Sequence, residues 1–297
     1  MSGSASRRDL GDGRWHFQHG PIDCIVAAGG DARAVAACIE HAWQRFRGVL
    51  DELVGELALL RADQSTPLSP RGRVARRMVD ACAPHARDGR FITAMAAVAG
   101  SVADELLAAF ADDGVARASI NNGGDIALRL TPGTSFEVGL CADPVRGRFG
   151  ASLDGRFTID ASSPVRGVAT SGWRGRSFSL GIADAVTVLS TSAARADAAA
   201  TIVANAVDVD DARVVRMPAS SVRDDSDLGD RLVTRHVPPL PEALVEQALD
   251  RGATEARAQI RAGRIIAAVL ALQGRWRVVG DIDATLPRAV RAELAVA

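Results

Sequence analysis

Residues 116–130 read Ala-Arg-Ala-Ser-Ile-Asn-Asn-Gly-Gly-Asp-Ile-Ala-Leu-Arg-Leu, and this stretch carries the pattern that decides the fold class. Two short segments, 116–120 and 126–130, flank an Asn-Asn-Gly-Gly-Asp sequence that is typical of a tight β-hairpin turn. Short apolar or alternating segments predict further strands at 136–141, 148–153, 156–159, 165–169, 185–189 and 213–217, with a closing hairpin over 264–279. The strands therefore come in runs.

Helices are expected on either side of this run of strands. Apolar side chains recur at three- and four-residue steps through residues 31–60, which predicts a long amphipathic helix. Further helices are predicted from Ser69-Pro70, over 93–110, around Asp197 and over 238–262, and the acidic segment 220–230 is expected to be a solvated loop. Because strands and helices come in separate runs, the pattern favours an α+β fold over a doubly wound parallel sheet.

The composition is that of a soluble globular protein. The chain has 297 residues, 47% hydrophobic residues and a formal net charge of −1, which argues against a nucleic-acid-coating or disordered protein. No apolar run approaches the ~20 residues that span a bilayer, and residues 1–20 are polar, so we expect a cytoplasmic protein without a membrane partner. The predicted organisation is an N-terminal arm over residues 1–20, followed by a single domain over 21–297.

Two residue types are absent, and their absence excludes whole classes of site. The chain has no lysine, so it has neither the lysine of a Walker A loop nor one for a pyridoxal Schiff base, and without tyrosine it has no tyrosine acid or base. The four cysteines are widely spaced, the five histidines show no metal-ligand spacing, and both sets are expected to be structural.

Residues 195–205, Arg-Ala-Asp-Ala-Ala-Ala-Thr-Ile-Val-Ala-Asn, contain a candidate metal half-site. The preceding Ser190-Thr191-Ser192 can cap a helix, so Asp197 and Thr201, four residues apart, project from the same face. A carboxylate and a hydroxyl side by side suit a hard cation such as Mg²⁺. The alternative is structural: Asp197 complements the helix dipole and Thr201 packs as a small residue.

Four motifs, taken in order, resemble the ApbE superfamily, whose best-known members are FAD:protein FMN transferases. Residues 96–104 look like a weakened form of the family's Lys-Gly-x-Ala-x-Asp motif. Gly123-Gly124-Asp125, then Ala169-Thr170-Ser171-Gly172, then Asp197 with Thr201 follow in the family's order, and the resemblance spans residues 20–210.

The resemblance implies a fold, a metal site and a nucleotide site. The family fold consists of two tandem related halves, of the T-fold type, each an antiparallel sheet backed by helices. By resemblance, Asp197, Thr201 and the backbone carbonyl of Ala96 hold Mg²⁺. The same resemblance assigns the binding of FAD or FMN to Gly100, Asp104, Asn122, Gly123, Gly124, Asp125, Thr170, Ser171, Gly172 and Asp184. From turn chemistry alone, the glycine-rich and Thr-Ser-Gly segments are equally compatible with plain turns.

Two departures from the family pattern bear on catalysis. The family's His-x-Ile-Asp-Pro-x-Thr-Gly motif is replaced by Phe178 to Asp184, which has no histidine, and Ala99 stands where the family has lysine. We therefore predict a protein that binds a flavin nucleotide with Mg²⁺ but transfers FMN poorly or not at all. Two other functions stay open: a different Mg²⁺-dependent transferase or hydrolase acting on a small diphosphate metabolite, and a non-catalytic accessory protein. An acceptor protein and a homodimer are compatible with the sequence, whereas a nucleic-acid partner is not expected.

Overall fold

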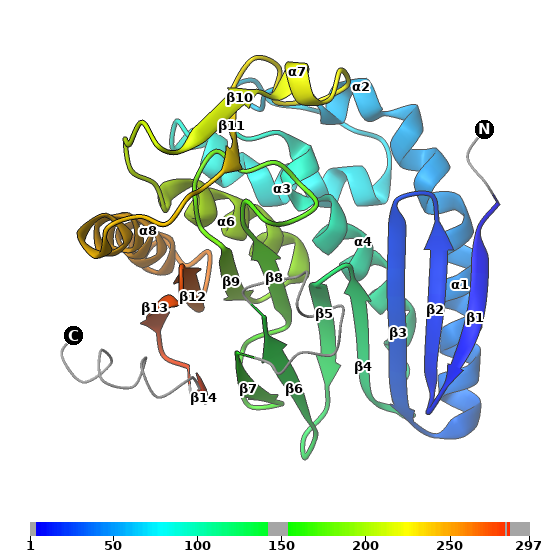
Figure 1. Cartoon of the computed structure of the whole chain (residues 1–297). Helices are drawn as coiled ribbons and strands as arrows, with labels where there is room; N and C mark the ends of the chain where they lie inside the picture. Colours follow the sequence, from blue (N-terminus) through cyan, green and yellow to red (C-terminus); the bar gives the residue numbers. More distant parts are fainter. Residues whose placement is uncertain (1–3, 142–153, 283, 286–297) are drawn as a thin grey trace. The chain divides into compact units, whose positions relative to one another are not determined.

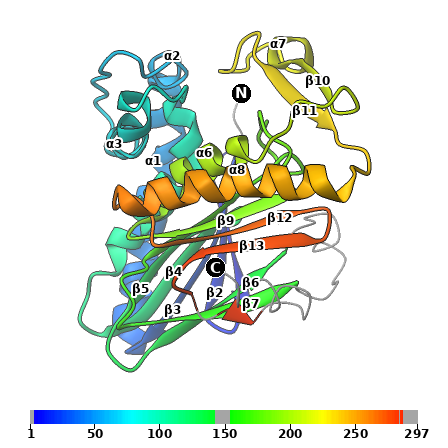
Figure 2. The same ribbon diagram turned by 90° about the vertical axis from the view of Figure 1, so that its left-hand side faces the viewer.

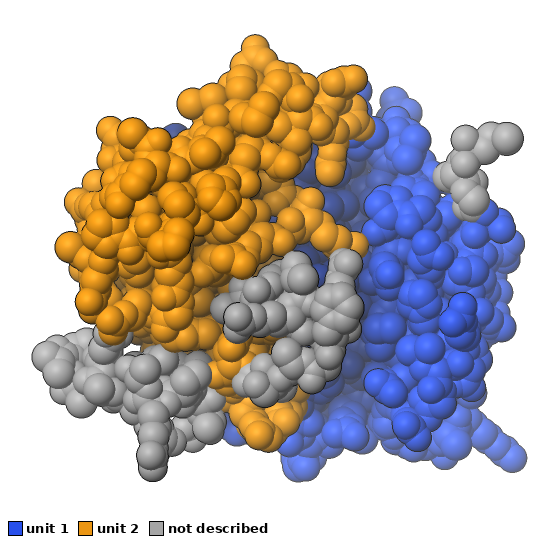
Figure 3. Space-filling view, viewed as in Figure 1, with its two compact units in different colours: residues 1–136, 159–169, 190–198 blue, residues 137–158, 170–189, 199–297 orange. Residues whose placement is uncertain are grey.

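The computed structural model describes residues 4–141, 154–282 and 284–285. These residues form two compact units, shown in different colours in Figure 3. Unit 1 comprises Met1–Phe136, Ile159–Ala169 and Ser190–Ala198, and unit 2 comprises Glu137–Thr158, Thr170–Leu189 and Ala199–Ala297. Two central elements, strand β8 (Gly167–Ser171) and helix α6 (Ala193–Ala206), are divided between the units.

Unit 1 contains a run of antiparallel strands that are neighbours in chain order. They are β1 (Ser6–Gly11), β2 (Arg14–His19), β3 (Ile22–Gly30), β4 (Val115–Asn122) and β5 (Asp125–Leu130). The first residues of β8 then pair with β5, with Val168 opposite Ile126. The predicted hairpin is confirmed, since Gly123 and Gly124 turn the chain between β4 and β5 with positive φ angles of 67° and 115°.

Unit 1 also contains several helical segments. They are α1 (Ala32–Gly55), α2 (Leu57–Leu60), α3 (Arg73–Arg87), η1 (Ala94–Ala97), α4 (Val98–Leu107), η2 (Ala108–Phe110) and the first residues of α6. α1 begins where the Asp31 carboxylate accepts hydrogen bonds from the N–H groups of Arg33 and Ala34, a standard N-cap. It lies on β2 and β3, while α4 lies on β4 and β5 (Figure 1).

An aromatic cluster joins α1 to the strands at the core of unit 1. Phe17 of β2 meets Trp43 and Phe46 of α1, with ring centroids 5.2 and 5.5 Å away. Phe17 and Phe46 are fully buried. The apolar stripe predicted along residues 31–60 is the face of α1 that covers this core, and burying such rings is a large part of what stabilises it.

Unit 2 holds two further helices and the remaining strands, each of them with all or most of its residues. Its strands are β6 (Ser135–Leu140), β7 (Gly155–Asp160), β9 (Ala185–Ser190), β10 (Val215–Pro218), β11 (Leu232–His236), β12 (Ala267–Leu272), β13 (Arg275–Gly280) and β14 (Ala284–Thr285). β12 pairs antiparallel with both β9 and β13, and β10 pairs with β11. Helix α8 (Glu242–Arg261) lies along β12 and β13 (Figure 2), and α7 (Ala219–Val222) is a single turn.

The α+β fold class is confirmed, because antiparallel strands in runs are backed by helices in runs. The division into two related halves stays a prediction. The strand expected at 148–153 lies outside the described residues. No helix within the described ranges has the length and apolar content that crossing a bilayer requires.

Three local expectations differ from the structure. Residues 1–20, expected to be a polar arm, contain the β1–β2 hairpin, whose outer strand exposes every side chain and so lacks an apolar alternation. The segment 220–230 overlaps the short helix α7. The helix predicted from Ser69 begins at Arg73 instead, because the Glu56 carboxylate accepts the N–H groups of Arg71 and Gly72 just before it.

Candidate functional site

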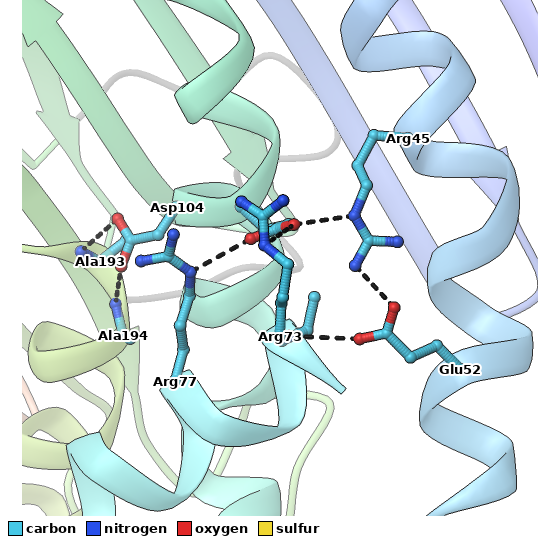
Figure 4. Close-up of polar contacts among 9 residues, drawn as sticks. Arg45, Glu52, Arg73, Arg77, Asp104, Ala193 and Ala194 are labelled. Atoms are coloured by element: carbon cyan, nitrogen blue, oxygen red, sulfur yellow. Dashed lines mark hydrogen bonds and ion pairs between the residues drawn. The ribbon is translucent and has the colours of Figure 1, made fainter. Parts of the chain in front are cut away.

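Helix α6 begins in unit 1 against the carboxylate of Asp104 (Figure 4). The two Asp104 oxygens accept hydrogen bonds from the N–H groups of Ala193 and Ala194, at 3.0 and 2.9 Å. The Ser192 hydroxyl accepts a further one from the N–H of Arg195 at 3.3 Å. Three N–H groups of the first turn are thus satisfied, two of them by a residue some ninety positions earlier in the chain. Asp104, assigned to the nucleotide by resemblance, has a defined role as a cap.

One turn along α6, Asp197 lies against the segment that resembles the Lys-Gly-x-Ala-x-Asp motif. The N–H of Gly100 donates to the Asp197 carboxylate at 2.9 Å. Gly100 has a steric reason to be glycine: a Cβ there would overlap the backbone carbonyl of Ala193. The backbones of residues 100 and 193 therefore approach closely, which brings two residues of the predicted site together.

Asp197 lies in an environment that disfavours its own charge. Burial raises the pKa of Asp197 well above its usual value, and the negative charge of Asp125 raises it further. Hydrogen bonds from the N–H groups of Gly100 and Ala99 act in the opposite direction, and Asp104 adds a smaller repulsion. Asp197 is therefore a buried carboxylate whose negative charge is opposed by both Asp125 and Asp104.

The glycine turn is tied to the same segment through Asn122. The buried Asn122 side chain donates from Nδ2 to the carbonyl of Ala99 at 3.1 Å. The N–H of Gly124 donates to the Asn121 side-chain oxygen at 2.8 Å, which closes the turn and leaves Gly123 and Gly124 exposed. The structure thus brings together Gly100, Asn122, Asp125 and Asp197 within unit 1.

The other two predicted magnesium ligands offer oxygen atoms of the right kind. Thr201 lies one turn beyond Asp197 on α6 and is partly buried. Ala96 lies in η1, where its N–H donates to the carbonyl of Thr93 at 3.2 Å. No group of three or more His, Cys, Asp or Glu side chains suited to a metal occurs among the described residues, so a site here depends on hydroxyl and carbonyl oxygens beside Asp197.

The remaining predicted nucleotide residues lie in unit 2. Thr170 and Thr187 share a hydrogen bond between their hydroxyl groups at 2.8 Å. Ser171 ends β8, and the next residue, Gly172, leaves no room for a Cβ, which would meet the carbonyl of Asp184. Gly172 is therefore required where the chain passes close to 183–184.

Asp184 is an anchor within unit 2. Its buried carboxylate accepts hydrogen bonds from the Trp173 indole N–H at 3.1 Å, from Arg174 Nε at 2.8 Å and from the Gln273 backbone N–H at 2.6 Å. The Arg174 guanidinium also stacks over the Trp173 ring, 5.1 Å from its centroid. Asp184 therefore holds the 173–174 loop to the turn between β12 and β13.

A buried carboxylate that belongs to none of the sequence motifs lies next to Asp104. Glu105, with 1% of its side chain exposed, pairs with Arg45 Nε at 2.8 Å and with Arg73 and Arg77 Nε at 3.3 Å. The three arginines are labelled in Figure 4. Burial raises the pKa of Glu105, but the three guanidinium groups outweigh it and the net shift is downward. The spacing of Arg73 and Arg77, one helical turn apart, was a signal in the sequence, whereas Arg45 lies on another helix.

With this geometry established, comparison with known proteins gives the family. A family model described as "AbpE bacteria" matches residues 6–278. The chain belongs to this family. The match runs well beyond the motifs at 96–104, 121–125, 167–172 and 197–201 and includes α8 and β12, so the resemblance expected from those motifs is confirmed for most of the chain.

Curated relatives of this chain include proteins named UPF0280. The UPF0280 protein of Methanoculleus marisnigri is 37% identical over 159 residues, which are 52% of this chain and 63% of that protein. The UPF0280 protein of Methanopyrus kandleri is 39% identical over 135 residues, 44% of this chain and 50% of its own length. The chain thus spans between half and two thirds of these two relatives.

Solved structures that align with this chain include two flavin transferases. The apo form of Pseudomonas stutzeri flavinyl transferase ApbE aligns over 97% of this chain and 96% of its own, with 16% identity and a TM-score of 0.43. The flavin transferase ApbE from Vibrio cholerae aligns over 98% and 99%, with 11% identity and a TM-score of 0.43. Family membership rests on the sequence match, and the roles of individual site residues stay predictions.

Proposed function

We propose that this protein binds a flavin nucleotide, FAD or FMN, together with Mg²⁺, and that Asp197 is the central metal ligand. One observation carries the proposal: the Asp197 carboxylate is held against the backbone of Gly100, beside Asp125 and Asp104, where burial and neighbouring negative charge raise its pKa. A divalent cation would neutralise these negative charges. It would account for the neighbouring carboxylates, which a helix cap at the surface does not require.

The donor set fits Mg²⁺ in kind. Mg²⁺ prefers hard oxygen ligands and takes only one or two carboxylates, with water and phosphate oxygens completing its shell. Asp197 supplies a carboxylate, and we assign the Thr201 hydroxyl and the Ala96 carbonyl to the same ion. When bound, the ion supplies charge neutralisation for the phosphate oxygens of a diphosphate.

The groups around Asp197 orient and admit the nucleotide. Exposed backbone at Gly123 and Gly124 allows a flat ring or a phosphate to approach closely, and we assign this turn to the nucleotide. Asn122 fixes the turn to the 99–100 segment, so it positions the site. We assign Thr170, Ser171 and Gly172 of unit 2 to the nucleotide as well, on the order of the family motifs, and Gly100, Asp104, Asp125 and Asp184 to positioning.

The chain departs from the family pattern at two places that bear on FMN transfer. The segment 178–184 brings no histidine, and Ala99 presents a methyl group where the family has lysine. We propose that the protein retains nucleotide binding and lacks efficient transfer, which leaves hydrolysis or transfer on another small diphosphate, or an accessory role without catalysis, as the alternatives.

The ligand that accompanies the purified protein tests this proposal. Visible absorption of the purified protein and mass spectrometry of the heat-released ligand should reveal a flavin nucleotide, and adding FAD with Mg²⁺ should raise the melting temperature more than FAD with EDTA. A different diphosphate compound in the released fraction would favour the alternative enzyme. Failure of both FAD and FMN to alter the melting temperature with Mg²⁺ present would contradict the proposal.

A further inference from the structure

Unit 1 contains a pocket of about 600 Å³ whose wall is rich in arginine. The pocket lies between α3, the end of α4, the last residues of β5 and the first turn of α6. Its arginines come from four separate places in the sequence: Arg77, Arg129, Arg166 and Arg195. Four guanidinium groups around one cavity repel one another, and an anion bound in the cavity would reduce this repulsion.

Arg129 has one hydrogen-bond donor with an acceptor and one buried donor without an acceptor among the described residues. Its Nη2 donates to the carbonyl of Asp112 at 3.2 Å. Its Nε is buried and has no hydrogen-bond partner among the described residues. A buried N–H without an acceptor is costly, and a ligand oxygen in the pocket that Arg129 lines would satisfy it.

Arg166 is held rigidly while keeping its charge. Its Nη1 donates to the carbonyls of Ser163 and Val165, both at 2.6 Å, and its Nη2 donates to the carbonyl of Ala161 at 2.9 Å. These carbonyls are neutral, and the nearby Asp160 carboxylate, whose pKa is lowered in part by Arg166, is the negative charge that faces the guanidinium. Such a pre-positioned cation loses little conformational entropy when an anion binds.

The carboxylates in the wall do not balance the arginines. Asp80 and Asp104 line the pocket, and Arg77 pairs with Glu105 at 3.3 Å. Both Asp104 oxygens are occupied by the first N–H groups of α6, as Figure 4 shows. Within the described residues, Arg129, Arg166 and Arg195 form no ion pair, so the wall retains excess positive charge.

We propose that this pocket binds the phosphate group of a small phosphorylated molecule. Planar guanidinium groups approaching from several sides match the oxygens of a tetrahedral dianion. The volume lies within the range of small-molecule sites and exceeds what one phosphate ion fills. Leu107, Leu128 and Leu130 give the pocket an apolar side for the rest of the molecule.

The pocket is separate from the proposed flavin and magnesium site. Of the residues assigned to that site, only Asp104 lines the pocket. Leu128 and Leu130 lie at the end of β5 remote from the Gly123-Gly124 turn, and Arg195 precedes Asp197 on α6. A phosphate ligand here requires no Mg²⁺, because the cationic side chains supply the charge.

Titration calorimetry with inorganic phosphate and AMP, in EDTA, tests the proposal on the full chain. We expect both probes to bind, AMP more tightly, with affinity falling as salt is added. The Arg195→Gln variant should weaken binding about tenfold or more, the cost of losing one charge-assisted hydrogen bond. Arg195 is exposed, so this change should leave the melting temperature of the free protein unaltered.

Two further comparisons make the result decisive. Arg76→Gln, an exposed arginine on α3 that does not line the pocket, should bind AMP like the unaltered chain, and so should Asp197→Asn. Arg129→Gln should lose AMP binding, and malate should bind more weakly than phosphate. Equal AMP affinity in the Arg195→Gln, Arg129→Gln and Arg76→Gln variants would overturn the proposal. Malate binding more tightly than phosphate, or no binding of phosphate and AMP, would also overturn it.

Discussion

The backbone N–H of Gly100 donates a hydrogen bond to the carboxylate of Asp197, 97 residues later in the sequence, over 2.9 Å. This contact fixes the first turn of α4 against the second turn of α6 within unit 1. It depends on the absence of a side chain at position 100, because a Cβ would overlap the carbonyl of Ala193. The position of Asp197, the proposed metal ligand, therefore depends on Gly100 as well as on the N–H of Ala99.

Replacing that glycine should disturb the site. Gly100→Ala forces the backbones of 100 and 193 apart, and we expect it to lower the free energy of unfolding by about 1–3 kcal/mol, the usual range for overpacking. Gly48→Ala is the matched control: it lies in α1 with open space around its Cβ position, and should stabilise the chain by up to about 1 kcal/mol. Urea denaturation of both variants measures the difference. A neutral Gly100→Ala variant would show that α4 and α6 are not held this closely.

The dependence of Mg²⁺ binding on pH follows from the raised pKa of Asp197. Its folded pKa lies well above the ordinary 3.8, so protons compete with the metal at pH values where an exposed aspartate is already ionised. We expect the apparent Mg²⁺ affinity to rise with pH through this raised pKa, by about tenfold per pH unit below it.

Without metal, Asp197 makes the folding stability fall as pH rises, whereas the Mg²⁺ affinity rises with pH. Because its folded pKa is raised, stability falls as pH increases from 3.8 through the folded pKa, and Asp197→Asn should remove this loss. Melting temperatures across the acidic to neutral range, with Mg²⁺ and with EDTA, measure both effects. An Mg²⁺ effect that is identical at every pH would exclude Asp197 as a ligand.

The Glu105 carboxylate should stabilise unit 1 through its three arginines. Glu105→Gln removes the charge and leaves Arg45, Arg73 and Arg77 facing a neutral amide. We expect a loss of about 2 kcal/mol, less than for a fully buried pair because Arg73 and Arg77 are partly exposed. The folded pKa of Glu105 is lowered, so its contribution is complete above 4.5 and disappears as pH falls through the lower value.

Denaturation of Glu105→Gln at neutral and at acidic pH tests this account. The difference from the unaltered chain should shrink in acid. Glu40→Gln removes a partner of Arg7 at the surface and should cost less than Glu105→Gln at neutral pH. Equal losses in the two variants would show that burial of Glu105 adds nothing.

The chain should be a poor FMN transferase. A positioned acid or base typically contributes about 100- to 10,000-fold to a rate, and neither segment 178–184 nor Ala99 supplies the family's histidine or lysine. Incubation with FAD, Mg²⁺ and a peptide carrying an acceptor threonine, followed by mass spectrometry, should give at most trace flavinylation. Modification as fast as that by a true transferase would mean that Asp184 or a neighbouring arginine performs the missing role.

Local chemistry explains which parts of the fold the sequence could predict. The hairpin at 116–130 follows from its turn residues, and α1 follows from its apolar stripe and the Asp31 cap, so both are predictable from neighbouring residues alone. Strand β3 was missed although its side chains are partly buried, and β1 was missed because an exposed edge strand has no apolar alternation.

The contacts of the candidate site were mostly beyond prediction from the sequence. Family motif order named Gly100 and Asp197, yet their hydrogen bond depends on how α4 packs against α6. The Asp104 cap on Ala193 and Ala194, and the four arginines around one pocket, join segments far apart in the chain. No local pattern encodes such convergence, whereas the spacing of Asp197 and Thr201 on one helix is local and could be anticipated.

Calorimetric titration with FAD tests whether Asp197 holds the Mg²⁺ on which flavin binding depends. The full chain is titrated once with Mg²⁺ present and once with EDTA. The same titrations are repeated on Asp197→Asn and on Asp51→Asn, an exposed control on α1. We expect stoichiometric FAD binding that requires Mg²⁺, is lost in Asp197→Asn and is unchanged in Asp51→Asn. Equal FAD binding by the unaltered chain and Asp197→Asn, or binding that EDTA leaves intact, would contradict this expectation.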